Sequence, residues 1–159
     1  MGVLIQINSQ RISSKSITQI GRSVKWGGVI LYPTETIYGL GCNAFDEEAV
    51  ARIFEIKGRP ETKPVLVLVW NLTMLKSIVA NIPPVAVKLM EKFWPGPLTM
   101  IFNAKKNISP LVTAGTGKIG VRIPGNSFCL KLLKEIQVPL VSTSASRMRN
   151  TGAFSARLP

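Results

Sequence analysis

The stretch GVILYPTETIYGLG, residues 28–41, decides the fold, because in it a buried strand runs into a polar strand end. Residues 28–32 are an apolar run that stops at Pro33, which is typical of a strand inside an α/β sheet. Ligands of open α/β sheets sit at the carboxyl ends of strands. If the strand continues, Thr34 and Thr36 point to the same side and could face one ligand. The other reading is turn chemistry, in which threonine hydroxyls bond the backbone and the glycines supply positive φ.

Strand-like and helix-like patterns alternate on both sides of this stretch. A period-two pattern predicts a strand at residues 3–8, and apolar runs predict strands at residues 28–32 and 64–70. Residues 98–103, 118–123 and 139–143 are also predicted to be strands. Helical spacing and capping residues predict helices at residues 16–26, 46–57, 71–80, 85–94 and 126–136. This alternation predicts an α/β fold. With 159 residues, no internal repeat and no interdomain linker, residues 1–159 are expected to form one domain.

The composition excludes several kinds of chemistry and favours an anionic partner. The chain has no histidine and two cysteines, which excludes a Ser-His-Asp triad, a Cys-His dyad and a histidine-containing zinc site. Two cysteines do not make a disulfide framework, so a reducing compartment is the simpler interpretation. One disulfide between these two cysteines stays an alternative. The 20 Lys and Arg against 8 Asp and Glu give +12, which favours a nucleotide, nucleic acid or membrane surface as partner. The other reading of the charge is solubility.

No stretch approaches the roughly 18 apolar residues that a membrane span requires. Residues 1–11 also lack the charged-then-apolar order of a signal peptide. We therefore expect a cytoplasmic protein.

Two further segments carry candidate binding residues. Three cations lie between a helix end and a strand, namely Lys57, Arg59 and Lys63. The compact charge of a lysine and the planar guanidinium of an arginine together suit a polyphosphate ligand. The dipole of the helix C-terminus could explain Lys57 alone, but not the other two cations. The segment LVSTSAS, residues 140–146, places small hydroxyl residues at a predicted strand end, where they could bond a carboxylate or phosphate. A common loop start is the alternative, and Arg122 on the preceding strand could add a cation.

Five segments together resemble the YrdC/YciO family. They are residues 32–41, Lys-Gly-Arg-Pro from Lys57, WPGPLT at 94–99, GVRIP at 120–124 and PLVSTSA at 139–145. They follow the order and spacing of that family over residues 16–145. The resemblance implies a single α/β domain with a twisted, mostly open mixed sheet, helices packed on it and a basic cleft.

The resemblance also implies a nucleotidyltransferase activity. L-threonine, bicarbonate and ATP would be joined into threonylcarbamoyl-AMP with release of pyrophosphate, and Mg²⁺ would be carried mainly by ATP. A separate transferase complex would pass the threonylcarbamoyl group to position 37 of tRNA, and double-stranded RNA or tRNA is a further expected partner.

Site residues follow from the matching motifs. The resemblance implies catalytic roles for Lys57 and Arg59, and nucleotide contacts for Arg59, Lys63, Lys118 and Ser144. It implies threonine contacts for Thr34, Thr36, Arg122 and Ser142, and no metal held by the protein itself.

The chain departs from the family pattern in two places. After Ala145 it continues Ser-Arg-Met-Arg, where the family normally has Asn and soon a Ser-Gly pair, and the family runs on for some tens of residues. A truncation, an altered reading frame and a short paralogue would each explain this, and the three stay open. Leu68 also stands where a polar residue, often histidine, is common.

The implied chemistry agrees with the residues that are absent. Threonine brings its own amine and bicarbonate its own electrophilic carbon, so the protein needs to position anions and stabilise charge rather than supply a nucleophile. A second hypothesis is a non-catalytic RNA- or nucleotide-binding module, which the basic excess favours. Aromatic residues are few and do not alternate with basic ones, so a base-stacking platform is not indicated.

Overall fold

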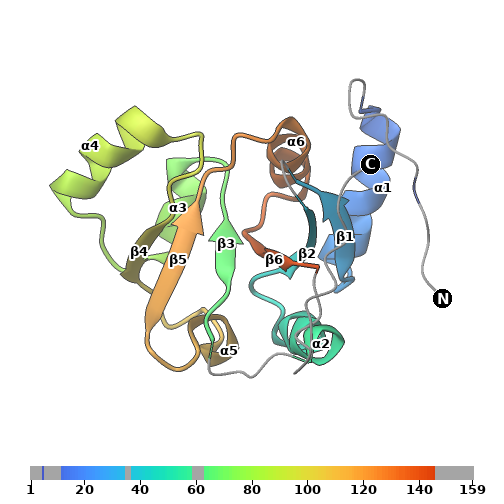
Figure 1. Cartoon of the computed structure of the whole chain (residues 1–159), viewed down its shortest axis with the longest axis horizontal. Helices are drawn as coiled ribbons and strands as arrows, with labels where there is room; N and C mark the ends of the chain where they lie inside the picture. Colours follow the sequence, from blue (N-terminus) through green and yellow to red (C-terminus); the bar gives the residue numbers. More distant parts are fainter. Residues whose placement is uncertain (1–4, 6–11, 35–36, 59–62, 146–159) are drawn as a thin grey trace.

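The computed structural model describes residues 5, 12–34, 37–58 and 63–145. These residues form a mixed six-stranded sheet in the order β1-β2-β6-β3-β5-β4 (Figure 1). Strands β3 and β5 are parallel, and the other neighbouring pairs are antiparallel. The strands are β1 (Ile30–Pro33), β2 (Tyr38–Asn43), β3 (Leu66–Leu68), β4 (Met100–Asn103), β5 (Lys118–Arg122) and β6 (Leu140–Ser144). The predicted α/β class with an open mixed sheet is confirmed.

Side-chain caps of the same geometry start four of the helices. Ser13, Asp46, Asn71 and Asn126 each accept a hydrogen bond from the backbone three residues later. The helices are α1 (Ser14–Lys25), α2 (Glu47–Lys57), α3 (Leu72–Ile78), α4 (Pro84–Phe93), α5 (Pro110–Thr113) and α6 (Ser127–Ile136). All five predicted helices are confirmed, and the short α5 is an addition.

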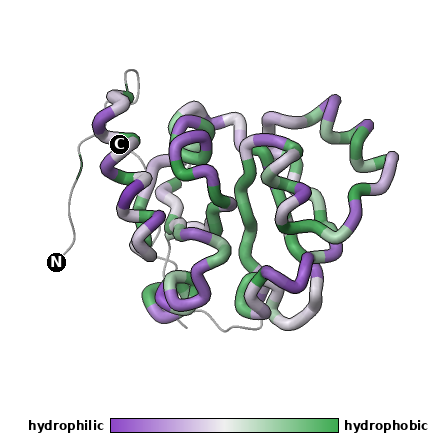
Figure 2. Tube along the Cα trace, turned by 180° about the vertical axis from the view of Figure 1, so that it is seen from behind, coloured by the Kyte–Doolittle hydropathy of each residue, from purple (hydrophilic) through white to green (hydrophobic). Residues whose placement is uncertain are grey.

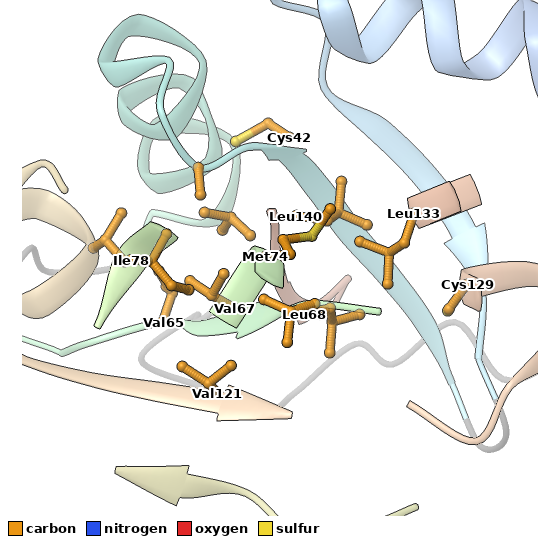
Figure 3. Close-up of a cluster of buried hydrophobic side chains, with 14 of the residues drawn as sticks. Cys42, Val65, Val67, Leu68, Met74, Ile78, Val121, Cys129, Leu133 and Leu140 are labelled. Carbon is orange, nitrogen blue, oxygen red and sulfur yellow. The ribbon is translucent and has the colours of Figure 1, made fainter. Parts of the chain in front are cut away.

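Helices lie around the sheet and bury its apolar side chains. Helices α1 and α6 pack on one another beside β1 and β2, whereas α4 stands beyond the β4 edge (Figure 1). Hydrophobic residues follow the central strands, and hydrophilic residues mark the outer turns of the helices (Figure 2). The core contains Val67, Val121 and Leu140 from the sheet with Met74 and Leu133 from the helices (Figure 3). This packing makes the sheet a rigid support for the residues at its rim.

Strand β2 is the main difference from the sequence-based prediction. The reading of Gly39 and Gly41 as turn glycines with positive φ is wrong, because both lie inside β2 and neither has a positive φ. Strand β2 is the partner of β1 in an antiparallel hairpin, with Tyr32 opposite Gly39. The strand predicted at residues 3–8 lies outside the described residues, apart from Ile5.

Candidate functional site

A pocket of about 310 Å³ opens where β6 ends, β3 begins and the hairpin from β1 to β2 turns. Thr34, Tyr38, Ser142 and Ser144 line it with polar groups, and Ile37, Gly39, Pro64, Val65, Leu66 and Thr143 complete the lining. Strand β1 ends at Pro33, and the Thr34 hydroxyl donates to the carbonyl of Ile37 across the turn. The Thr34 hydroxyl therefore bonds the backbone of the turn, as the alternative interpretation predicted, and Thr34 also lines the pocket.

The register of the sheet places four predicted site residues on one face. Leu66 is opposite Ser142 on one side and opposite Gly120 on the other, and directly opposed side chains share a face. Ser144 lies two residues after Ser142, and Lys118 and Arg122 lie two residues on either side of Gly120. Because side chains alternate along a strand, all four point to that face.

The two cations on β5 lie at different heights on this face. Lys118 is at the level where β3 begins and β6 ends, so it shares the pocket's end of the sheet with Ser144. Two strand spacings separate β6 from β5, about 10 Å. Arg122 lies at the level of Leu68 and Leu140, toward the other end of the strands.

Lys57 is buried, and from the end of α2 its ammonium reaches Ser144, a residue of the pocket lining. Its side chain is 3% exposed, and its Nζ donates to the carbonyl oxygen of Ser144 at 2.5 Å and to the Oγ of Ser144 at 3.2 Å. Gly58 ends the helix in the left-handed conformation at φ 58°. Besides lying in the last turn of α2, Lys57 therefore bonds through its ammonium to the end of β6.

Tyr32 is connected to the pocket through Ser142. The phenol is 1% exposed, and its oxygen lies 2.5 Å from the Oγ of Ser142. The ring of Phe128, from α6, stacks on the Tyr32 ring with centroids 6.0 Å apart. Tyr32 is therefore held on both sides, by its hydroxyl and by its ring.

The remaining predicted cations differ in their surroundings. Arg122 donates through Nε and Nη2 to the hydroxyl of Thr99, at 3.0 and 2.7 Å. Lys118 donates to Oδ1 of Asn103 at 2.5 Å, beside a second pocket of about 240 Å³ at the β4 edge. Lys63 is exposed and precedes Pro64, which lines the first pocket. The structure thus brings Thr34, Ser142 and Ser144 together in the pocket lining and bonds Lys57 to Ser144. Lys63 lies next to Pro64 of the lining, and Lys118 and Arg122 lie farther along the same sheet face.

Two predicted residues, Arg59 and Thr36, lie outside the described residues, and so does Glu35 between the two threonines. Two residues not predicted from the sequence, Tyr32 and Thr99, hold Ser142 and Arg122 through hydrogen bonds. Each stands inside a motif that resembles the family, but nothing in the spacing says which strand its hydroxyl would reach.

The described part of the chain offers no group of three or more His, Cys, Asp or Glu side chains that could hold a metal ion. Across these same residues, no helix has the length and apolar character needed to cross a membrane.

Comparison with known proteins places these observations in a family. The family model described as "Telomere recombination" (Sua5/YciO/YrdC) matches residues 22–157. A protein of Pyrococcus abyssi named threonylcarbamoyl-AMP synthase is 36% identical over 146 residues, which is 92% of this chain and 43% of that protein. One of Saccharophagus degradans with the same name is 32% identical over 152 residues, 96% of this chain and 79% of that protein.

A solved structure of Pyrococcus abyssi Sua5 complexed with L-threonine matches with a TM-score of 0.81 and 36% identity, covering 84% of this chain and 39% of that one. The chain spans about two fifths of the length of the Pyrococcus abyssi relative and of a Bacillus subtilis relative, of which it covers 43% and 38%. Because the family model matches most of the sequence and the fold agrees, the chain belongs to the Sua5/YciO/YrdC family.

Proposed function

We propose that this protein is a nucleotidyltransferase that forms threonylcarbamoyl-AMP and pyrophosphate from L-threonine, bicarbonate and ATP. The observation that carries the proposal is the buried ammonium of Lys57 bonded to Ser144 at the rim of a pocket that Ser142 and Thr34 also line. A cation held beside small hydroxyl groups suits a ligand with a carboxylate and phosphates. Relatives named for this activity and a relative's complex with L-threonine support the choice of substrate.

The reaction requires positioning more than covalent participation by the protein. The threonine amine attacks the carbon of bicarbonate, and loss of water leaves a carbamate. A carbamate oxygen then attacks the α-phosphorus of ATP, a new phosphorus–oxygen bond forms, and the bond to the β-phosphate breaks so that pyrophosphate leaves. Charge accumulates on phosphate oxygens during this step, and fixed cations stabilise such charge in a site that excludes water.

In this proposal the residues of the site divide between the two ends of the product. Ser142, Thr34 and Thr36 bind threonine, and Arg122 pairs with its carboxylate. Lys57, Arg59, Lys63, Lys118 and Ser144 hold the nucleotide. Magnesium enters as part of the ATP substrate, carried mainly by the phosphates. The product would serve the modification of position 37 of tRNA, with a separate transferase complex as the partner.

Pyrophosphate release by the purified chain tests the proposal. We expect release that requires L-threonine, bicarbonate and Mg·ATP together and falls to background when any one is omitted. Arg59→Ala should remove most of the activity, whereas Lys131→Ala, an exposed lysine on α6, should retain it. Full activity of Arg59→Ala would contradict the role of that residue.

The alternative is a module of the same fold that binds RNA or nucleotide without turnover, favoured by the charge of +12. It would give no pyrophosphate under any substrate combination. It would instead bind double-stranded RNA with an affinity whose logarithm falls steeply with the logarithm of the salt concentration.

A further inference from the structure

We propose that Tyr32 is a positioning residue that donates its phenolic hydrogen to Ser142 and thereby makes the Ser142 hydroxyl a hydrogen-bond donor to the anionic end of the ligand. This inference rests on the proposed function, because the ligand it names is the carboxylate of L-threonine. Tyr32 does not line the pocket, and its hydroxyl contacts Ser142, which does.

The geometry requires the Tyr32 side chain to cross a whole strand. Tyr32 is on β1 and Ser142 is on β6, and β2 lies between them in the sheet. Adjacent strands are about 4.8 Å apart, so the two backbones are separated by about 10 Å. The ring therefore lies over the backbone of β2 before its hydroxyl reaches Ser142 at 2.5 Å.

Two glycines provide the space for this crossing. A Cβ on Gly39 would lie 3.0 Å from Cζ of Tyr32, and a Cβ on Gly41 would lie 2.9 Å from Cε1 of the same ring. Gly39 is opposite Tyr32, and Gly41 is opposite Ser142, so the two glycines mark the two ends of the path. The sequence Gly-Leu-Gly in β2 is thus explained by the ring above it, and no positive φ is needed.

The direction of the hydrogen bond follows from the acidity of the two hydroxyl groups. A phenol has a pKa near 10 and is a stronger donor than an aliphatic alcohol. When Tyr32 donates, the Ser142 oxygen is occupied as an acceptor and its own hydrogen is left for another acceptor. Ser142 is only partly buried and faces the pocket, where a carboxylate oxygen is the acceptor that the proposed substrate brings.

A double-mutant cycle tests this role. We would measure the Kd for L-threonine by calorimetry, and KM and kcat by pyrophosphate release, for the wild type, Tyr32→Phe, Ser142→Ala and the double variant. Tyr32→Phe keeps the ring and its stacking, and it should raise Kd and KM about fivefold, the value of one hydrogen bond, with kcat within about twofold. In the Ser142→Ala background, the same change should have no further effect on Kd. Ser23→Ala, which removes an exposed hydroxyl on α1, is the matched control and should leave all three constants unchanged.

The outcomes separate this inference from the proposed function. If the wild type releases pyrophosphate and Tyr32→Phe binds L-threonine as tightly as the wild type, the positioning role is wrong and the proposed function stands. Equal losses from Tyr32→Phe in the wild-type and Ser142→Ala backgrounds would also overturn the role, since Tyr32 would then act independently of Ser142. If the wild type binds L-threonine without releasing pyrophosphate, the proposed function fails and the calorimetric cycle still decides the role. A wild type that binds no L-threonine overturns both.

Discussion

The Nζ of Lys57 lies 2.5 Å from the carbonyl oxygen of Ser144, which is 87 residues later in the chain. This bond connects the last residue of α2 to the last residue of β6. It places a cation at the end of β6, where Ser144 lines the pocket. The methylene groups of the Lys57 side chain lie on the buried face of α2 together with Val50, Ile53 and Phe54. The position of the cation is therefore fixed by the packing of the helix.

Lys57→Met is expected to remove the positive charge of this side chain while keeping its apolar packing in the helix. Methionine keeps an unbranched apolar side chain of similar length, so the helix should remain docked and the melting temperature should change little. Pyrophosphate release should fall about 100-fold, the usual loss when one preorganised donor is removed from a site of developing negative charge. Steady-state kinetics and circular dichroism melts measure the two effects.

Lys131→Met is the matched control for this prediction, because Lys131 is exposed on α6. It should change neither rate nor melting temperature. A Lys57→Met variant with the wild-type rate would remove Lys57 from the catalytic site, and one that is inactive and unfolded would assign the loss to packing.

Thr99→Val is expected to weaken threonine binding through Arg122. Both Nε and Nη2 of Arg122 donate to the Thr99 hydroxyl, so the guanidinium is held along the sheet face. Valine has the same shape without the acceptor, which frees the guanidinium to adopt other rotamers. We expect KM for L-threonine to rise about two- to tenfold, with kcat nearly constant. Thr73→Val, at an exposed position of α3, is the control, and an unchanged KM in Thr99→Val would show that this contact does not position Arg122.

A structural feature could be predicted from the sequence when the residues that determine it are close together in the chain. Helix caps are local, and Asp46, Asn71 and Asn126 start their helices as expected because each oxygen accepts from a backbone amide three residues away. Strand β2 was not predicted as a strand, because glycine has a low β-propensity and the reason for two glycines is the Tyr32 ring on the neighbouring strand. The same limit applies to the site, since the contacts of Tyr32 with Ser142 and of Arg122 with Thr99 depend on strand order and register.

Gly41→Ala is expected to destabilise the fold. The new methyl group would lie 2.9 Å from both the Tyr32 ring and the carbonyl oxygen of Val141, and backbone cannot move aside as a flexible side chain can. We expect a loss of about 1–3 kcal/mol in the free energy of unfolding, measured by urea denaturation.

Gly120→Ala provides the comparison within the same sheet. A methyl group there meets the Thr99 side chain at 3.5 Å, an ordinary contact, and the residue has no positive φ. Its free energy of unfolding should stay close to the wild-type value. Similar losses in both variants would assign the effect to glycine replacement in strands in general and not to the crossing of Tyr32.

Burial of Cys42 is expected to make the folded state less stable as the pH rises above about 9. Its side chain is fully buried in β2, and burial, followed by the nearby charge of Asp46, raises the thiol pKa from 9.0 to about 12, against a smaller lowering by Arg52. An unfolded chain keeps a thiol pKa near its ordinary value of about 9. Between these two values the folded state holds a proton that the unfolded state has released, so the unfolded state is favoured as pH rises.

The expected slope is a loss of about 1.4 kcal/mol in the free energy of unfolding per pH unit above about pH 9, with no loss from this thiol below pH 8. Lysines and tyrosines also titrate in this range, so the quantity to measure is the difference in unfolding free energy between the wild type and Cys42→Ala. Urea denaturation at intervals from pH 7 to 10.5 should show the advantage of the wild type shrinking above pH 9, because alanine carries no proton to release. A difference that stays constant over the whole interval would show that the Cys42 thiol titrates alike in the folded and unfolded chains, and would contradict its burial as the cause of the shift.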